Sequence, residues 1–221
     1  NLITTFMKRI FKYTAMLMLG ASIAGCATSA ITGRKYLKLV DSQQINDQAA
    51  LAYKDFLSKN NSKVVTGTAA ATQVKRVGSN IAVAANQYLK QLGIADKFNF
   101  NWEFNLIESP DVNAWCMPGG KVVVYTGLLP ITQNEAGLAV VIGHEIAHAV
   151  AQHGSQRMSQ GLLQQLGGAA LQIAMANKPA ETQNMFMTAY GIGTTVGVML
   201  PFSRKDENEA DQYGLYFSAM A

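Results

Sequence analysis

Residues 132–150 read TQNEAGLAVVIGHEIAHAV and hold the pattern that decides the fold. Thr132 stands three residues ahead of Glu135, which is the spacing of a capping box, and the apolar residues that follow recur at helical intervals. The sequence therefore predicts a helix that begins just after this threonine. His144 and His148 are four residues apart, so both imidazoles project from one face of the helix, close enough to bind one metal ion.

Glu145 lies between the two histidines, beside the coordination position that such a metal would leave open. Zinc accepts imidazole and carboxylate ligands, and catalytic zinc sites keep water in the fourth place, where it loses a proton near neutral pH. Glu145 is therefore predicted to be the catalytic base. A chance pattern on a surface helix is the alternative, but residues 138–150 are largely apolar, and unliganded histidines there would be costly to bury.

A third metal ligand is expected in the acidic segment SRKDENEAD, residues 203–211. Glu207 and Asp211 are one helical turn apart, so Glu207 can bind the ion while Asp211 holds a ligating histidine in one tautomer. Glu209 lies about 200° round the helix from Glu207, so both cannot point at one ion. The competing interpretation is a solvated acidic helix start, which the histidine pair makes less favourable.

One further histidine follows the metal pattern closely in the sequence. His153 comes five residues after His148, which on a continuous helix places it about 140° off the face of His148. We therefore predict that His153 does not bind the metal.

The first 25 residues have the three-part layout of a secretory signal, with Met7 as the first candidate start. Lys8 and Arg9 precede an apolar run of about a dozen residues, which is short of the roughly 20 that a membrane span needs. We expect three regions: a signal peptide over residues 1–25, a lipidated tether over residues 26–41, and a catalytic domain over residues 42–221.

Residues 23–26, Ile-Ala-Gly-Cys, resemble the bacterial lipobox, which implies that Cys26 is lipidated and becomes the mature N-terminus. Two or three acyl chains would anchor the protein stably. Ala27, in place of aspartate, favours sorting to the outer membrane by resemblance to sorted lipoproteins. The expected location is lipid-anchored at the outer membrane and facing the periplasm. The other cysteine, Cys116, is left without a disulfide partner and is predicted to be buried.

The formal net charge of +4 arises largely in the leader. Without its three basic residues, 15 of the 18 basic residues remain against 14 acidic ones. With nearly equal numbers of basic and acidic residues, the chain beyond the leader has no excess of positive charge, so no nucleic-acid partner is expected. The apolar residues 185–201 are interrupted by glycine and threonine, and we interpret them as a buried helix or a loop over the active site.

Periodicity elsewhere predicts an α+β fold that is mainly helical. Residues 42–59 and 69–92 show apolar positions at helical spacing, whereas residues 99–106 alternate as a half-buried strand does. A turn at residues 118–120 leads into a second strand over residues 121–126. These two strands form a small sheet before the histidine-bearing helix.

Extended substrate is expected to pair with an edge of this sheet. Residues 113–117 and the strand at residues 121–125 offer that edge, and pairing with main chain would give broad specificity.

The histidine pattern followed by His153-Gly154, and then residues 207–211, resembles peptidase family M48, the Ste24 and HtpX group of zinc metalloproteases. Its periplasmic lipoprotein members look most similar. Residues 113–115, 118–120 and 126–129 also match the family's segment ahead of the metal helix, and the resemblance covers roughly residues 30–221.

The resemblance implies a zincin-type metalloprotease domain with one Zn²⁺ per chain. It implies that the chain is a zinc-dependent endopeptidase, degrading misfolded or membrane-associated proteins in the bacterial periplasm. The alternative is a zinc-stabilised chaperone or assembly scaffold, with outer-membrane assembly machinery as its partner. Members of the family continue past the third ligand, so the domain is expected to be truncated at its C-terminus. The implied residues are the ligands His144, His148 and Glu207 and the base Glu145. From the spacing and the strand pattern, Asp211 is expected to support a ligating histidine, and substrate is expected to bind at Asn113, Ala114, Gly119 and Gly120.

Overall fold

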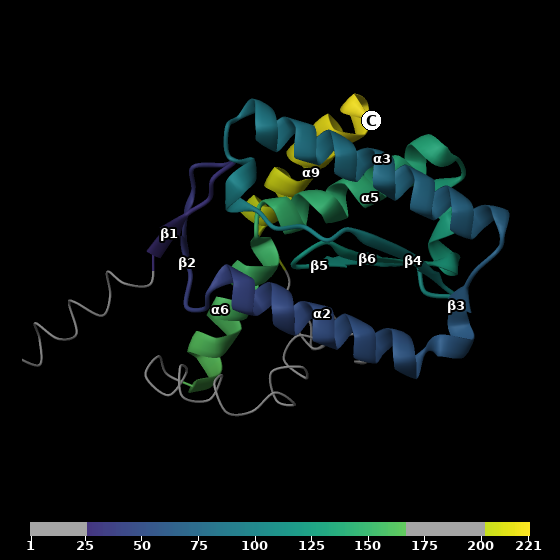
Figure 1. The fold of residues 1–221 in the computed structure, drawn as a ribbon, viewed down its shortest axis with the longest axis horizontal. Helices are drawn as coiled ribbons and strands as arrows, with labels where there is room; N and C mark the ends of the chain where they lie inside the picture. Colours follow the sequence, from purple (N-terminus) through teal and green to yellow (C-terminus); the bar gives the residue numbers. More distant parts are fainter. Residues whose placement is uncertain (1–25, 167–201) are drawn as a thin grey trace, which may run out of the picture.

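The computed structural model in Figure 1 describes residues 26–166 and 202–221. The predicted signal peptide and the apolar residues 185–201 lie outside the described residues. Within the described ranges, none of the helices combines the length and apolar character needed to cross a bilayer.

The two helices predicted from periodicity are confirmed almost residue for residue. Helix α2 spans Ser42–Lys59 and α3 spans Ala69–Gln91. Asp41 caps α2 by accepting hydrogen bonds from the first backbone amides, and Thr68 does the same for α3. The polar caps fix where the two helices start, and the apolar stripe on each helix packs into the core.

A four-stranded sheet has the order β3-β4-β6-β5. Strands β4 and β6 run parallel, while β3 and β5 pair antiparallel at the two edges. The sheet includes both strands expected from the sequence, although the first begins at Glu103 and not at residue 99, and two further ones. Its strands are β3 (Val64–Val65), β4 (Glu103–Ile107), β5 (Ala114–Met117) and β6 (Lys121–Tyr125).

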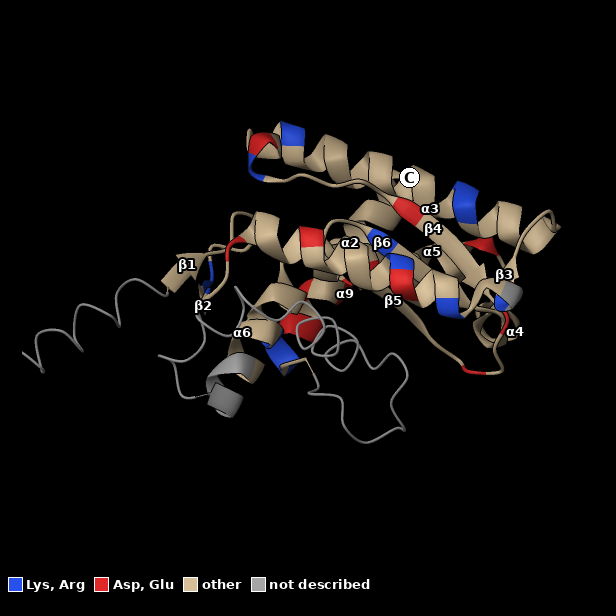
Figure 2. Ribbon diagram, turned by 60° about the horizontal axis from the view of Figure 1, so that its bottom comes forward, with Lys and Arg blue, Asp and Glu red and all other residues tan. Residues whose placement is uncertain are grey.

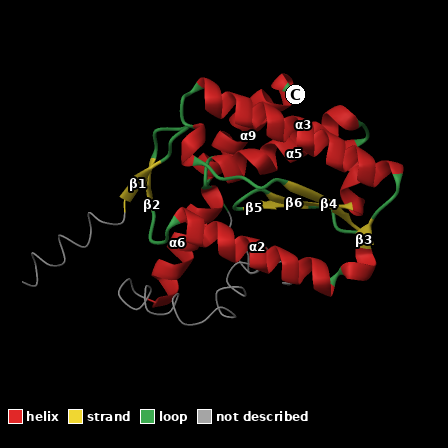
Figure 3. Ribbon diagram, viewed as in Figure 1, coloured by secondary structure: helices red, strands yellow, loops and turns green. Residues whose placement is uncertain are grey.

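Helices cover both faces of this sheet, as Figures 1 and 3 show. Val122 and Val124 pack in the larger core with α3, α5 (Glu135–Val150) and α9 (Arg204–Met220). Val123 and Trp115 face the other way, into a second core with α2. Side chains of β6 therefore alternate between the two faces of the sheet and contact a helical layer on each side. The predicted α+β class is confirmed.

The other helical elements in the described ranges are four short ones and the 14-residue helix α6. They are η1 (Asn61–Lys63), η2 (Ala95–Lys97), η3 (Thr126–Leu128), α4 (Leu129–Thr132) and α6 (His153–Leu166). Figure 2 shows acidic and basic positions interspersed along α2, whereas the charged positions of α3 are all basic.

The predicted start of the histidine-bearing helix is wrong in detail. Thr132 ends the short helix α4, and Gln133 then adopts a positive φ of 60°. Asn134 is the actual cap, because its side chain accepts a hydrogen bond from the backbone amide of Gly137. Asparagine is as good a cap as threonine, and the preceding turn decides which residue takes the role.

Residues 26–41, expected to be a tether, are docked on the domain along part of their length. Strands β1 (Cys26–Thr28) and β2 (Lys35–Leu37) form an antiparallel ribbon. Arg34 makes ion pairs with α9, and the Tyr36 hydroxyl donates a hydrogen bond to Gln152. These partners lie more than a hundred residues away in the chain, so local sequence could not indicate them.

Candidate metal centre

Helix α5 presents the two predicted histidine ligands from one face. The Nε2 atoms of His144 and His148 are 2.9 Å apart, and the ring of Phe202 stacks on His148 with centroids 4.1 Å apart. His148 is only 4% exposed, while His144 is partly open to solvent. The one-turn spacing read from the sequence thus yields a pair of converging nitrogens.

Helix α9 brings the third predicted ligand to the same place. A capping box between Ser203 and Asp206 fixes the start of this helix. One carboxylate oxygen of Glu207 lies 3.4 Å from Nε2 of His144, and the other lies 3.9 Å from Nε2 of His148. Donor atoms of these three residues all fall within 4.8 Å of one another.

Asp211 lies one turn further along α9, against the far side of the His144 ring. Its carboxylate accepts a hydrogen bond of 2.9 Å from Nδ1–H of His144. A neutral imidazole with its proton on Nδ1 keeps a lone pair on Nε2, which is the atom that faces His148 and Glu207. The side chain expected to support a ligand from outside the coordination sphere is therefore placed to do so.

The donor set fits zinc. Burial, followed by the neighbouring His144 and His153, lowers the pKa of His148 to about 2, so its ring is neutral and available as a donor at physiological pH. Two neutral imidazoles and one carboxylate form the three-ligand set that catalytic zinc sites use. His144, His148 and Glu207 would hold such an ion.

Glu145 sits half-buried on α5 between the histidines. Its pKa is raised to about 8, mainly by burial and secondly by the negative charge of Glu207. Arg157 and a hydrogen bond from the backbone amide of Cys116 act in the opposite direction. A raised pKa means a high proton affinity, so the ionised form of this carboxyl group is well suited to take a proton from water.

Of the two segments predicted to offer an edge to substrate, β5 is an edge strand, whereas β6 lies inside the sheet between β4 and β5. The prediction that β6 offers an edge is therefore wrong. The Tyr125 amide donates a hydrogen bond to the carbonyl group of Asn113. Residues that hydrogen-bond to β6 alternate along β5, so the backbone groups of Ala114 and Cys116 point to the side away from β6. Cys116 is buried, as predicted, and its amide reaches Glu145.

Two of the predicted substrate residues, Gly119 and Gly120, lie on the turn between β5 and β6, and Gly119 is the one near His148. Gly119 and Gly120 have positive φ values of 79° and 89°, which glycine adopts readily. Their carbonyl groups accept hydrogen bonds from Asn101 and Glu103, so they are committed to the sheet.

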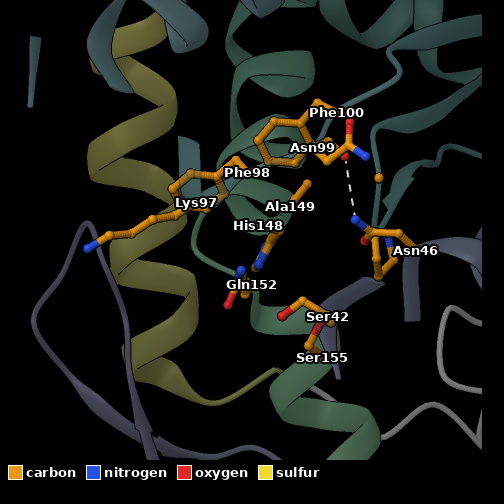
Figure 4. A pocket seen from close by; sticks show the side chains of 13 residues that line it. Ser42, Asn46, Lys97, Phe98, Asn99, Phe100, His148, Ala149, Gln152 and Ser155 are labelled. Carbon is orange, nitrogen blue, oxygen red and sulfur yellow. Dashed lines mark hydrogen bonds between the residues drawn. The ribbon is translucent and has the colours of Figure 1, made fainter. Parts of the chain in front are cut away.

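A pocket opens beside His148, and Gly119 is one of its lining residues (Figure 4). Phe98 and Phe100 provide an aromatic wall, whereas Ser42 and Asn46 provide a polar one. Asn113, Ala114 and Gly120 do not line this pocket. The structure therefore places Asn113 and Ala114 at the β5 edge and Gly119 at the pocket, while Gly120 belongs to neither.

His153 is placed by a break that the sequence argument did not include. Helix α5 ends at Val150, and Gln152 has a φ of 60°, so the assumption of a continuous helix is wrong. His153 lies outside the group of three ligands, but its Nδ1 is 2.9 Å from Nδ1 of His148. A histidine just after the pattern was visible in the sequence, whereas its direction was not.

Comparison with known proteins gives consistent similarities. The model of peptidase family M48 matches residues 68–221. The mitochondrial metalloendopeptidase OMA1 of Schizosaccharomyces pombe is 31% identical over 212 residues, covering 91% of this chain and 57% of the relative. The enzyme of that name in Arabidopsis thaliana is 40% identical over 121 residues, covering 55% of this chain and 23% of the relative.

A bacterial protein is also similar. The beta-barrel assembly-enhancing protease of Escherichia coli is 31% identical over 140 residues, covering 58% of this chain and 28% of the relative. The chain thus spans less than two thirds of the length of each of these relatives.

Proposed function

Because the chain belongs to peptidase family M48, we propose that it is a zinc-dependent endopeptidase. One observation carries the proposal: His144, His148 and Glu207 converge from two helices, and Glu145 lies beside them with a raised pKa. A purely structural zinc site closes with a fourth protein ligand and has no use for a base. Among the described residues, the group that converges with these histidines holds three donors.

Each side chain has a distinct task in the proposed reaction. Zinc held by the three ligands would polarise the scissile carbonyl and lower the pKa of the attacking water. Glu145 takes the proton from that water and later delivers it to the leaving amine. Asp211 keeps His144 in the tautomer that binds metal.

The proposed substrate is a protein segment in extended conformation. Ala114 has its backbone donor and acceptor on the side of β5 away from β6, next to α5, where the amide of Cys116 is already bound to Glu145. Addition of a strand there recognises main chain more than side chain, so broad specificity toward misfolded or membrane-associated proteins follows. Asn113 and Gly119 flank this edge at its two ends.

The test of the function is casein degradation by the purified chain in three states: as isolated, after dialysis against a chelator, and after zinc is returned. We expect activity in the first state, none in the second, and recovery in the third, because the metal would supply the charge that polarises the carbonyl and the water. Full activity after complete removal of metal, checked by elemental analysis, would contradict the proposal.

A periplasm-facing, lipid-anchored location at the bacterial outer membrane is the second part of the proposal. The lipobox-like residues ending at Cys26 support it, and a bacterial relative is named for enhancing beta-barrel assembly. Other relatives are named as mitochondrial, so localisation needs its own test.

Cys26→Ser is expected to abolish incorporation of labelled palmitate and to release the chain from the membrane fraction, because the sulfur atom is the one that carries the thioether. Cys116→Ser is the matched control, since this second cysteine is buried and should not be acylated. Equal labelling of Cys26→Ser and the unaltered chain would show that Cys26 is not lipidated.

A further inference from the structure

We propose that Glu209 and His153 are positioning residues that fix the tautomer of His148 and so leave its Nε2 free for metal. The proposal rests on the proposed metal site and extends it to residues that do not touch the ion. It gives a task to a fully buried histidine that the three-ligand scheme leaves unused.

The contacts form a continuous chain from α9 to the metal face of α5. One carboxylate oxygen of Glu209 lies 2.9 Å from Nε2 of His153. Nδ1 of His153 lies 2.9 Å from Nδ1 of His148, whose own Nε2 faces His144 and Glu207. His153 is 0% exposed, so water cannot replace these hydrogen bonds.

The position of each proton follows from what each atom can do. A carboxylate only accepts, so the proton of neutral His153 lies on Nε2 and is donated to Glu209. Because His153 is fully buried, its neutral form is favoured, so its Nδ1 accepts and Nδ1 of His148 donates. With its proton on Nδ1, His148 keeps a lone pair on Nε2, where a metal needs it.

Arg34 sets the orientation of Glu209 in this chain. Its Nε donates to Oε1 of Glu209 at 2.8 Å, and its guanidinium also pairs with Asp206. His153, Asp206 and Glu209 could resemble a second metal site, but the guanidinium already supplies positive charge to both carboxylates. Support of a histidine tautomer is therefore a better account of this cluster than a second ion.

The two metal histidines thus receive the same support in two ways. Asp211 accepts directly from Nδ1 of His144. Glu209 acts on His148 through the ring of His153, which transmits the preference for one proton position.

The direct test is ¹⁵N NMR of the metal-free chain, because the ring nitrogens of a neutral imidazole differ in frequency according to which one carries hydrogen. We expect the proton of His148 on Nδ1. Finding it on Nε2 in the unaltered, metal-free chain would overturn the proposal, whichever metal the protein uses.

Three variants test the causal order. In Glu209→Gln the amide oxygen should stay with Arg34 and turn the NH₂ group toward His153, which reverses both tautomers. Zinc affinity should then fall about ten- to a hundredfold. His153→Leu should lose a similar amount, whereas His153→Gln should retain most of the affinity, since its amide can accept from His148 and donate to Glu209.

The pattern across the variants separates the possible failures. Equal losses in His153→Gln and His153→Leu would mean that only packing matters, and unchanged affinity in Glu209→Gln would mean that the tautomer is not controlled from α9. Either result rejects the proposal. Glu207→Ala is the reference for the metal site itself, because unchanged zinc binding in this variant would refute the three-ligand site as well.

Discussion

Replacement of Glu145 by glutamine is expected to lower peptide hydrolysis about a hundredfold or more while the chain keeps its zinc and its fold. Glutamine has nearly the same shape, so packing beside Cys116 is preserved, but an amide cannot accept the proton of the attacking water. The raised pKa of Glu145 indicates how strongly this site favours a bound proton. The measurement is kcat on a quenched peptide, together with zinc content and thermal melting.

Glu135→Gln is the matched control for this variant. Glu135 lies in the first turn of the same helix and pairs at the surface with Arg76, an exposed interaction that contributes little to stability. Hydrolysis by the control should stay close to that of the unaltered chain. Full activity in Glu145→Gln, or loss of its zinc, would show that Glu145 is not the base.

Gly214→Ala is expected to destabilise the chain by about 1–3 kcal/mol, although alanine is the better helix former. A Cβ atom at residue 214 would lie 2.7 Å from the backbone nitrogen of His144 and 2.9 Å from the carbonyl carbon of Gly143. These neighbours are backbone atoms, so α5 and α9 would have to separate. Glu207 and Asp211 would then move away from the histidines that they serve.

Gly214→Ala should lower the rate of hydrolysis by more than its loss of folded protein would explain. A shift of about 1 Å at a reacting centre can cost about a hundredfold in rate, and we expect a loss of that order in hydrolysis, with weaker zinc binding. Gln212→Ala, on the exposed face of α9, controls for altered helix propensity. An increase in melting temperature for Gly214→Ala, as propensity alone predicts, would show that the contact between the helices can relax.

The parts of the structure that the sequence predicted are those governed by local rules. The apolar periodicity defined α2 and α3, and the four-residue spacing of His144 and His148 placed both rings on one face. The same spacing chose Glu207 and Asp211 over Glu209, and the structure brings the first two to His144. One helical turn is enough information for each of these steps.

The parts that escaped prediction depend on distant partners. Val64 and Val65 form a strand only because they pair with Leu106 and Ile107. Arg34 reaches Glu209 across 175 residues of chain, and nothing local distinguishes it from other surface arginines. The direction of His153 depends on a single positive φ at Gln152, a conformation that few non-glycine residues adopt.

The contact between α5 and α9 joins segments far apart in the chain, since His144 and Asp211 are separated by 67 residues. In polymer terms, an ion shared by these helices is a cross-link that closes a large loop of the unfolded chain. The entropy of closing such a loop grows only logarithmically, by about 0.6 kcal/mol for each doubling of its length. The distance between the two metal motifs along the sequence is therefore weakly constrained by energy, whereas the one-turn spacing within each motif is rigid. Order and internal spacing identify the site, and the length of the connecting chain says little about it.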